Sequence, residues 1–217
     1  MFKRNQTSDL FLQEASALDY WENSSAQKKI FLDTPNPRKY AALIKASQLD
    51  FQVLTQCDAG KLDLVLLCPI ADEKPVSVNV FLNLKHSDCQ IKLHLIALVK
   101  TQAKTSLKAT IFMEPKLQNT ACHLLEETVI LAPEVSLESV PILDIHAKNI
   151  QASHGAKIYR LDEEKLFYLQ SKGLSRRGAE QLLLTSYGQR LMADIPLMEE
   201  EKSELMSDFL AFIGKEW

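Results

Sequence analysis

The chain has 217 residues, 46% of them hydrophobic, and its 25 Lys and Arg against 28 Asp and Glu give a net charge of −3. This length and hydrophobic content suffice for one substantial core or two small ones, which excludes a mainly disordered chain. The near-balanced charge excludes a dedicated nucleic-acid binder, because such proteins carry an excess of positive charge for the phosphates.

Residues 8–47 are predicted to form two helices. Apolar residues recur near the helical period in this segment, first at Leu10, Phe11, Leu18 and Trp21 and again over residues 40–44. Two prolines, Pro35 and Pro37, separate the two groups and are expected to mark the break between the helices. We therefore expect residues 1–49 to be an N-terminal helical segment.

Residues 50–160 are predicted to be a β core, because the apolar period changes to two from about residue 51. The alternation is clearest over residues 76–84, 91–96 and 107–113, and it is less strict over residues 129–131 and 142–145. No glycine occurs between Lys61 and His154, so Asp, Asn, Ser and Pro must form the turns, as at residues 72–75 and 87–88. The pattern fits a sandwich, a barrel or a wound β-solenoid, and the glycine-poor turns favour the solenoid.

Residues 161–217 are predicted to form a C-terminal bundle of three short amphipathic helices. Asp162 is expected to cap the first helix, which Gly173 ends, and Ser175 is expected to cap the second, which stops before Pro196. The third helix is expected to run from about residue 198 to residue 214.

Several familiar motifs are absent from the sequence. Its six glycines form no GxGxxG, Walker A or GxSxG pattern, which argues against a nucleotide-binding or serine-hydrolase site. Its four cysteines form no CxxC pair, so a zinc knuckle or redox motif is not indicated. No apolar run has the length of a membrane span, and the first residues lack the apolar core of a secretory signal. We expect a soluble protein of the cytoplasm that has no membrane or nucleic-acid partner.

Four blocks of residues stand in a fixed order near the C-terminal end: PILDI at 141–145, SHGA at 153–156, LDEEKLFYL at 161–169 and SKGL at 171–174. Together they resemble the C-terminal region of the SufB/SufD family of the SUF iron-sulfur cluster assembly system, most closely its SufD branch. The likeness reaches upstream to about residue 118 and is faint before it, so the chain resembles a relative truncated on its N-terminal side. Lys157 stands where the family has threonine, and Tyr159 stands where it has glycine.

The resemblance implies a fold, a role and partners. The implied fold is a short right-handed parallel β-helix with helices at each end, and the implied role is that of a scaffold subunit that is not itself an enzyme. A SufB-like scaffold would pair with the β-helix, and a SufC-like ATPase would bind the C-terminal helices; a homodimer is an alternative. An iron-sulfur cluster or iron would bind transiently at the partner interface, with none held tightly by the isolated chain, in the cytoplasm or a plastid.

The resemblance also singles out candidate site residues. His154, the histidine of the family's His-Gly-Ala motif, is the candidate metal ligand, because an imidazole held by a partner binds iron well. Cys122 is a second candidate with suitable soft thiolate chemistry, although a free cysteine is commonly a small buried hydrophobe. Phe167 and Tyr168 are candidates for partner contact or for the core of the bundle.

Arg176 and Arg177 are further candidates for partner contact. Both stand in the first turn of a predicted helix, where the helix dipole disfavours a positive charge. They therefore need an opposing charge from elsewhere, and we expect an external partner to supply it.

Two other functions remain open from the sequence. A degenerate adaptor would keep the protein contacts and lack the metal role, a reading that Lys157 and Tyr159 make plausible. A carbohydrate-active β-helix enzyme would need paired carboxylates facing a cleft. The strand region instead offers isolated acids, such as Asp63, Asp88 and Glu114.

Overall fold

The computed structural model describes residues 9–11, 16–21, 25–71, 73–195 and 197–214. Within these residues the strands are β1 (Asp9–Phe11), β2 (Ser16–Trp21), β3 (Ser25–Leu32), β4 (Arg38–Ile44), β5 (Gln48–Thr55), β6 (Lys61–Ile70), β7 (Val76–Leu84), β8 (Gln90–Val99), β9 (Lys104–Met113), β10 (Gln118–Ile130), β11 (Ser136–Ile145) and β12 (Asn149–Arg160). The helices are α1 (Glu163–Ser171), α2 (Arg176–Asp194) and α3 (Glu199–Gly214).

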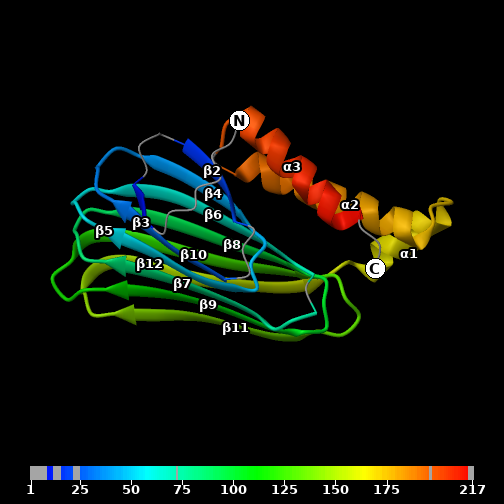
Figure 1. Ribbon diagram of the computed structural model, residues 1–217, viewed down its shortest axis with the longest axis horizontal. Coiled ribbons are helices and arrows are strands. Elements are labelled where there is room, and N and C mark those ends of the chain that lie inside the picture. Colours follow the sequence, from blue (N-terminus) through cyan, green and yellow to red (C-terminus); the bar gives the residue numbers. More distant parts are fainter. Residues whose placement is uncertain (1–8, 12–15, 22–24, 72, 196, 215–217) are drawn as a thin grey trace.

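The strands form two parallel sheets that together make a solenoid. The odd-numbered strands lie in one sheet in the order β1-β3-β5-β7-β9-β11, and the even-numbered strands lie in the other in the order β12-β10-β8-β6-β4-β2. Successive strands therefore alternate between the sheets, and each coil of the chain adds one strand to each sheet (Figure 1). This is a parallel β-helix, so the predicted solenoid is confirmed.

The main hydrophobic core lies between the two sheets. In β7, alternate residues from Val76 to Leu84 are buried and the residues between them are partly exposed, which is the period-two pattern seen in the sequence. Corresponding residues of neighbouring coils stack on one another: Val78 pairs with Leu49 on one side and with Leu107 on the other. The interior is thus a column of aliphatic side chains contributed by every coil.

The corners of the solenoid use Asp and Asn where other folds use glycine. Asp88 and Asn119 occupy equivalent turns of successive coils and have positive φ angles of 59° and 51°, and Ala59 has the same conformation at the corresponding turn of the preceding coil. Asn119 Nδ2 donates to Asp88 Oδ1 at 3.3 Å, and Asn149 Nδ2 of the next coil donates to Asn119 Oδ1 at 3.1 Å. Short polar side chains tolerate this left-handed conformation, as the glycine-free sequence predicts.

Helices cover one outer face of the solenoid. A second apolar cluster joins the outward side chains of the even-numbered strands, such as Leu67 and Ile96, to Leu205, Phe209 and Ile213 of α3. In Figure 1, α2 and α3 lie along the side of the solenoid near β2, β4 and β6, and α1 extends beyond it. None of the described helices is long and apolar enough to cross a membrane.

The predicted helix boundaries near the C-terminus are confirmed. The side chain of Asp162 accepts hydrogen bonds from the backbone N–H groups of Glu164 and Lys165 and so caps α1. Ser175 caps α2 by accepting a hydrogen bond from the Gly178 N–H. Gly173 follows α1 with a φ angle of 95°, a conformation that favours glycine and ends the helix.

The helices predicted over residues 8–47 are wrong, because the described residues of this segment form strands β1 to β4. The burial pattern of β4 explains the error. Its residues 40–44 are buried on both faces, with Tyr40 in the core between the sheets and Leu43 under the helices. A strand covered on both faces loses the period of two and reads as a continuous apolar run. Residues 8, 12–15 and 22–24 lie outside the described residues.

Gly188 allows α2 to approach α3 closely, and this contact gives a first prediction. A Cβ atom at position 188 would lie 2.6 Å from Cε1 of the buried Phe209 ring. Overpacking costs about 1 to 3 kcal/mol, whereas replacing glycine in a helix by alanine gains about 1 kcal/mol. We expect Gly188→Ala to lower the free energy of unfolding by roughly 1 kcal/mol, taken as the difference of these two effects, in denaturant titrations. Gly214→Ala, whose Cβ would meet nothing within 4 Å, should show no loss; equal stability of both variants would contradict the prediction.

Candidate functional site

The last coil leaves one end of the solenoid open. Among the described strands, β11 pairs only with β9, and β12 pairs only with β10. Each strand therefore has one edge whose backbone N–H and C=O groups meet no neighbouring strand, a feature that commonly pairs with another chain. Apolar side chains are also uncovered here, since Val140 is 38% exposed and Ile158 is 52% exposed.

His154 lies near the middle of β12 on the side that faces the interior of the last coil. It stands opposite Leu124 of β10, which belongs to the core between the sheets. Its side chain is exposed and makes no hydrogen bond within the part of the chain that the structure describes. Lys157 stands opposite Glu127, on the outer face. The imidazole is therefore accessible from the open end of the solenoid, and the ammonium group lies on the other face of the strand.

Glu126 is a buried carboxyl group near His154 that sequence analysis missed. It lies on the inner face of β10 and is 1% exposed. Ser139 of β11 donates a hydrogen bond to Oε2 at 2.5 Å, while Oε1 has no partner among the described residues. Burial raises the pKa of Glu126, opposed by hydrogen bonds from the Ser139 side chain and the Ala109 backbone and by the charge of His154. The alternation of residues 122–128 could have indicated that Glu126 is buried, because it puts Glu126 on the same face as Leu124.

Cys122 lies on the same face of β10, four residues before Glu126. It is fully buried, and burial raises the pKa of its thiol to about 12. Its partner on β12 is Ala152, whereas the partner of His154 is Leu124. A thiolate at this position would be costly, so the surroundings of Cys122 are those of a small core residue. In the described part of the chain, no three His, Cys, Asp or Glu side chains are grouped to hold a metal ion.

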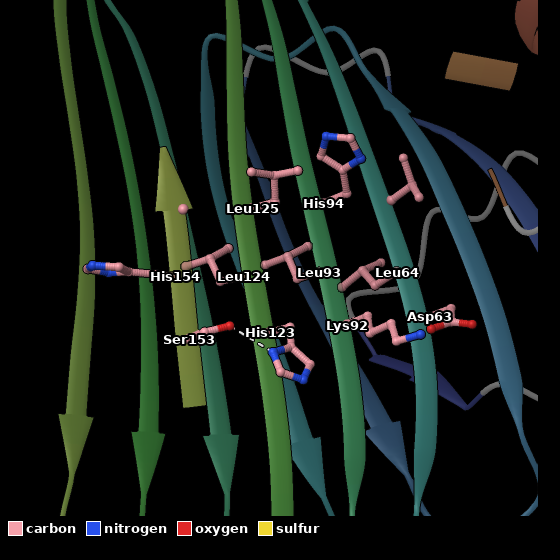
Figure 2. Close-up of a pocket in the computed structure, with 12 residues that line it drawn as sticks. Asp63, Leu64, Lys92, Leu93, His94, His123, Leu124, Leu125, Ser153 and His154 are labelled. Atoms are coloured by element: carbon pink, nitrogen blue, oxygen red, sulfur yellow. Dashed lines mark hydrogen bonds between the residues drawn. The ribbon is translucent and has the colours of Figure 1, made fainter. Parts of the chain in front are cut away.

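A pocket of about 530 Å³ lies on the outer face of the even-numbered strands, and His154 is also among the residues that line it. Polar side chains from four neighbouring strands form one row of it: Asp63, Lys92, His123 and Ser153. His123 Nδ1 and Ser153 Oγ lie 2.7 Å apart. Figure 2 shows His154 pointing away from His94 and His123, so the two faces of the sheet carry different histidines.

Polar contacts connect this pocket to the helices. His94 Nε2 lies 3.0 Å from Glu127 Oε2, and the Tyr159 hydroxyl donates to Glu127 Oε1 at 2.6 Å. Burial alone would raise the pKa of Glu127, but the hydrogen bonds from Tyr159 and His94 outweigh it and lower that pKa. Tyr159 in turn packs edge-on against Tyr187 of α2, with 6.1 Å between ring centroids. These residues join the sheet to the helix layer.

The four candidates for partner contact lie on the helices. Phe167 and Tyr168 on α1 are 75% and 59% exposed, so they are surface residues rather than the core of a bundle. Arg176 makes two contacts with the Glu163 carboxylate, at 2.7 and 2.8 Å, and a third with Glu180 at 2.8 Å.

The opposing charges for Arg176 therefore come from α1 and α2 themselves, and its contact with an external partner stays a prediction. Arg177 donates to the Gly214 carbonyl at 3.4 Å and so contacts the end of α3.

Comparisons with known proteins identify the family. A model of the SufBD core domain of the SUF iron-sulfur cluster assembly system matches residues 45–187. A SufBD family protein of Synechocystis is 26% identical over 153 residues, covering 70% of this chain and 34% of that protein. The chloroplastic protein ABCI7 of Arabidopsis thaliana is 33% identical over 82 residues, which cover 38% of this chain and 17% of that protein.

The iron-sulfur cluster assembly protein SufD of Escherichia coli is 28% identical over 69 residues, which cover 32% of this chain and 16% of SufD. The matched regions thus span about a third or less of the length of these relatives. The family model, by contrast, covers well over half of this chain and includes most of its solenoid together with α1 and much of α2. The chain therefore belongs to the SufBD family of iron-sulfur cluster assembly proteins.

Proposed function

We propose that this chain is a SufD-like scaffold subunit of a SUF iron-sulfur cluster assembly complex and not an enzyme. In this role it pairs with a SufB-like scaffold through its last coil and binds a SufC-like ATPase through its C-terminal helices. The observation that carries the proposal is the open last coil, with unpaired strand edges and an exposed histidine facing its interior. The proposed compartment is the cytoplasm, or the interior of a plastid.

The open coil suits a partner that is itself built of strands. The free edges of β11 and β12 offer backbone hydrogen bonds to an added strand, and such bonds give affinity without a deep pocket. Val140 and Ile158 supply apolar surface beside the two edges. A SufB-like β-helix docked here would extend the solenoid, and a second copy of this chain is the alternative partner.

The proposed cargo is iron or an iron-sulfur cluster, bound transiently between the two scaffolds. A cluster requires about four protein ligands, and a single exposed imidazole cannot hold one. His154 would therefore act together with ligands from the partner that covers it. The open end of the solenoid, toward which His154 faces, leaves room for such ligands.

The helices are the proposed contact for the ATPase. Phe167 and Tyr168 expose two aromatic rings on α1, a residue type that is enriched in protein interfaces. Arg176 links α1 to α2 through Glu163, and Ser175 caps α2 directly before it. The aromatic pair is thus presented on a helix whose orientation is fixed by a two-pronged ion pair.

Two rival functions have less support. The degenerate adaptor function was inferred from Lys157 and Tyr159. Both residues lie on the outer face of β12, and Tyr159 packs under the helices. Neither residue changes the face that carries His154. For a carbohydrate-active enzyme, Asp63 lies on β6, Asp88 in the corner before β8 and Glu114 beside Lys85 at 3.2 Å. These acids come from different parts of the solenoid and form no facing pair.

The first prediction of this proposal concerns association. Co-expressed with a SufB-like scaffold and a SufC-like ATPase of its organism, the chain should copurify with both. Ile158→Asp puts a charge on the apolar surface beside the free edge of β12 and should weaken scaffold binding at least about tenfold, measured by analytical ultracentrifugation. Thr110→Asp, on the outer face of β9, is the matched control. Separate elution of the three wild-type proteins at micromolar concentration would refute the proposal.

The second prediction concerns α1. The double variant Phe167→Ala/Tyr168→Ala removes exposed aromatic side chains and should lower the affinity for the ATPase by about tenfold or more, because interface aromatics commonly cost over 1 kcal/mol when truncated. Binding is measured by calorimetry, and the melting temperature should stay unchanged. Met198→Ala, which removes a side chain that is 61% exposed directly before α3, should bind normally. Equal affinity of all three proteins would place the ATPase contact elsewhere.

The third prediction concerns His154. In the assembled complex, His154→Ala should reduce the cluster or iron content after anaerobic reconstitution while leaving the melting temperature unchanged, since the side chain is exposed and makes no hydrogen bond among the described residues. His123→Ala, on the opposite face of the same sheet, should retain the wild-type content. Unchanged content in His154→Ala would favour the adaptor function.

A further inference from the structure

Two buried polar atoms inside the last coils lack hydrogen-bond partners among the described residues. They are Oε1 of Glu126 and Oγ1 of Thr128, and both residues are 1% exposed. Both stand on the inner face of β10, two positions apart. Buried polar groups are almost always paired, so an unpaired one calls for a specific explanation, such as a bound ion or a chemical role.

Side chains from three strands converge on Glu126. Ser139 of β11 donates to Oε2 and fixes the carboxyl group, while Oε1 remains available. On β12, Ala156 is the direct partner of Glu126 and has a small side chain, and the carboxyl group itself is buried. His154 stands two residues before Ala156 on the same face, near enough for its charge to act on the Glu126 carboxyl.

We propose that Glu126 and His154 together form this chain's half of a divalent iron site inside the last coil. The inference rests on the proposed function, which supplies the partner that completes the site. A carboxylate and an imidazole are a ligand pair that Fe²⁺ accepts readily. Ser139 is a positioning residue, because its hydrogen bond to Oε2 fixes the carboxyl group whose Oε1 has no partner among the described residues. The remaining ligands come from water in the isolated chain and from the docked scaffold in the complex.

The neighbouring residue Glu127 shows why this assignment is specific. Glu127 lies on the outer face of the same strand, and both of its oxygens are hydrogen-bonded, one to Tyr159 and the other paired with His94. It is fully occupied in connecting the sheet to the helices. The outer pocket is also a poor cation site, because Lys92 stands between Asp63 and His123 in its polar row. Of the two adjacent carboxylates, only Glu126 has an oxygen free to bind a metal ion.

The test uses the purified full chain and Co²⁺ as a spectroscopic substitute for Fe²⁺. Wild-type protein should develop visible absorption bands that saturate on titration with Co²⁺. Glu126→Gln and His154→Ala should each weaken the Co²⁺ affinity at least about tenfold, because each removes one of two protein ligands. Ser139→Ala should weaken it about tenfold, the lower end of the range for residues that orient a metal ligand.

Two control variants test whether the loss of Co²⁺ binding is specific to the proposed site. Glu138→Gln changes an exposed carboxylate on the outer face of β11, and His123→Ala changes a histidine of the outer pocket; both should bind Co²⁺ as the wild type does. Glutamine at position 126 can still accept the Ser139 hydrogen bond, so melting temperatures should show that this variant is folded. Absence of saturable Co²⁺ binding by the wild type, or unchanged affinity in Glu126→Gln, would overturn the inference.

The measurement does not need a partner, so its failure can be distinguished from failure of the proposed function. If the chain copurifies with the scaffold and the ATPase but Glu126→Gln binds Co²⁺ normally, the half-site is wrong and the scaffold role stands. If Glu126→Gln loses Co²⁺ binding but no association occurs, the half-site stands and the proposed assembly is wrong.

Discussion

The constraint on which this structure depends is that a parallel β-helix cannot close its own ends. Each coil is stabilised by backbone hydrogen bonds and apolar contacts with the coil on either side, as β7 is by β5 and β9. A terminal coil has only one such neighbour. At the β11–β12 end this leaves two strand edges and a partly exposed interior, whereas a closed barrel has no free strand edge. An interaction surface is therefore a consequence of the fold itself.

Because side chains alternate along a strand, adjacent residues lie on opposite faces and have different contacts. On β10, Glu126 faces the interior of the coil and Glu127 faces the helices; on β12, His154 faces the interior and Ser153 faces the outer pocket. Each pair is adjacent in sequence and yet experiences different burial and different partners. A one-residue insertion or deletion that shifted the register of the strand by one would exchange the two sets of contacts. Register is consequently as important to the candidate site as residue identity.

Sequence patterns predicted the parts of this fold in which each element has one buried face. The alternation in residues 76–84 indicated a strand, and Asp162 and Ser175 indicated helix starts, because each of these signals is local. The strands of residues 16–44 were mistaken for helices because β4 is buried on both faces, so the signal that distinguishes strand from helix vanished. Whether a strand will be covered by helices from the other end of the chain is a tertiary property.

The candidate site was only partly predictable for a related reason. His154 could be singled out through the His-Gly-Ala motif, but Glu126 belongs to no motif and gains its significance from Ser139, a residue of the facing sheet. Likewise, the sequence placed Arg176 at an unfavourable helix position and could not show that Glu163 of the preceding helix compensates it. Sequence reasoning identified groups that needed a partner, and the fold determined which of them find one within the chain.

A hydrogen-bonded residue of β12 also connects the last coil to the C-terminal helices. Tyr159 on β12 contacts Glu127 and Tyr187, so this strand is held against α2. His154 lies on the same strand, on the opposite face. β12 therefore connects the helix layer to the coil that carries His154. Any partner that moves α2 must either move β12 as well or separate the rings of Tyr159 and Tyr187, which pack against the apolar cluster between the sheet and the helices.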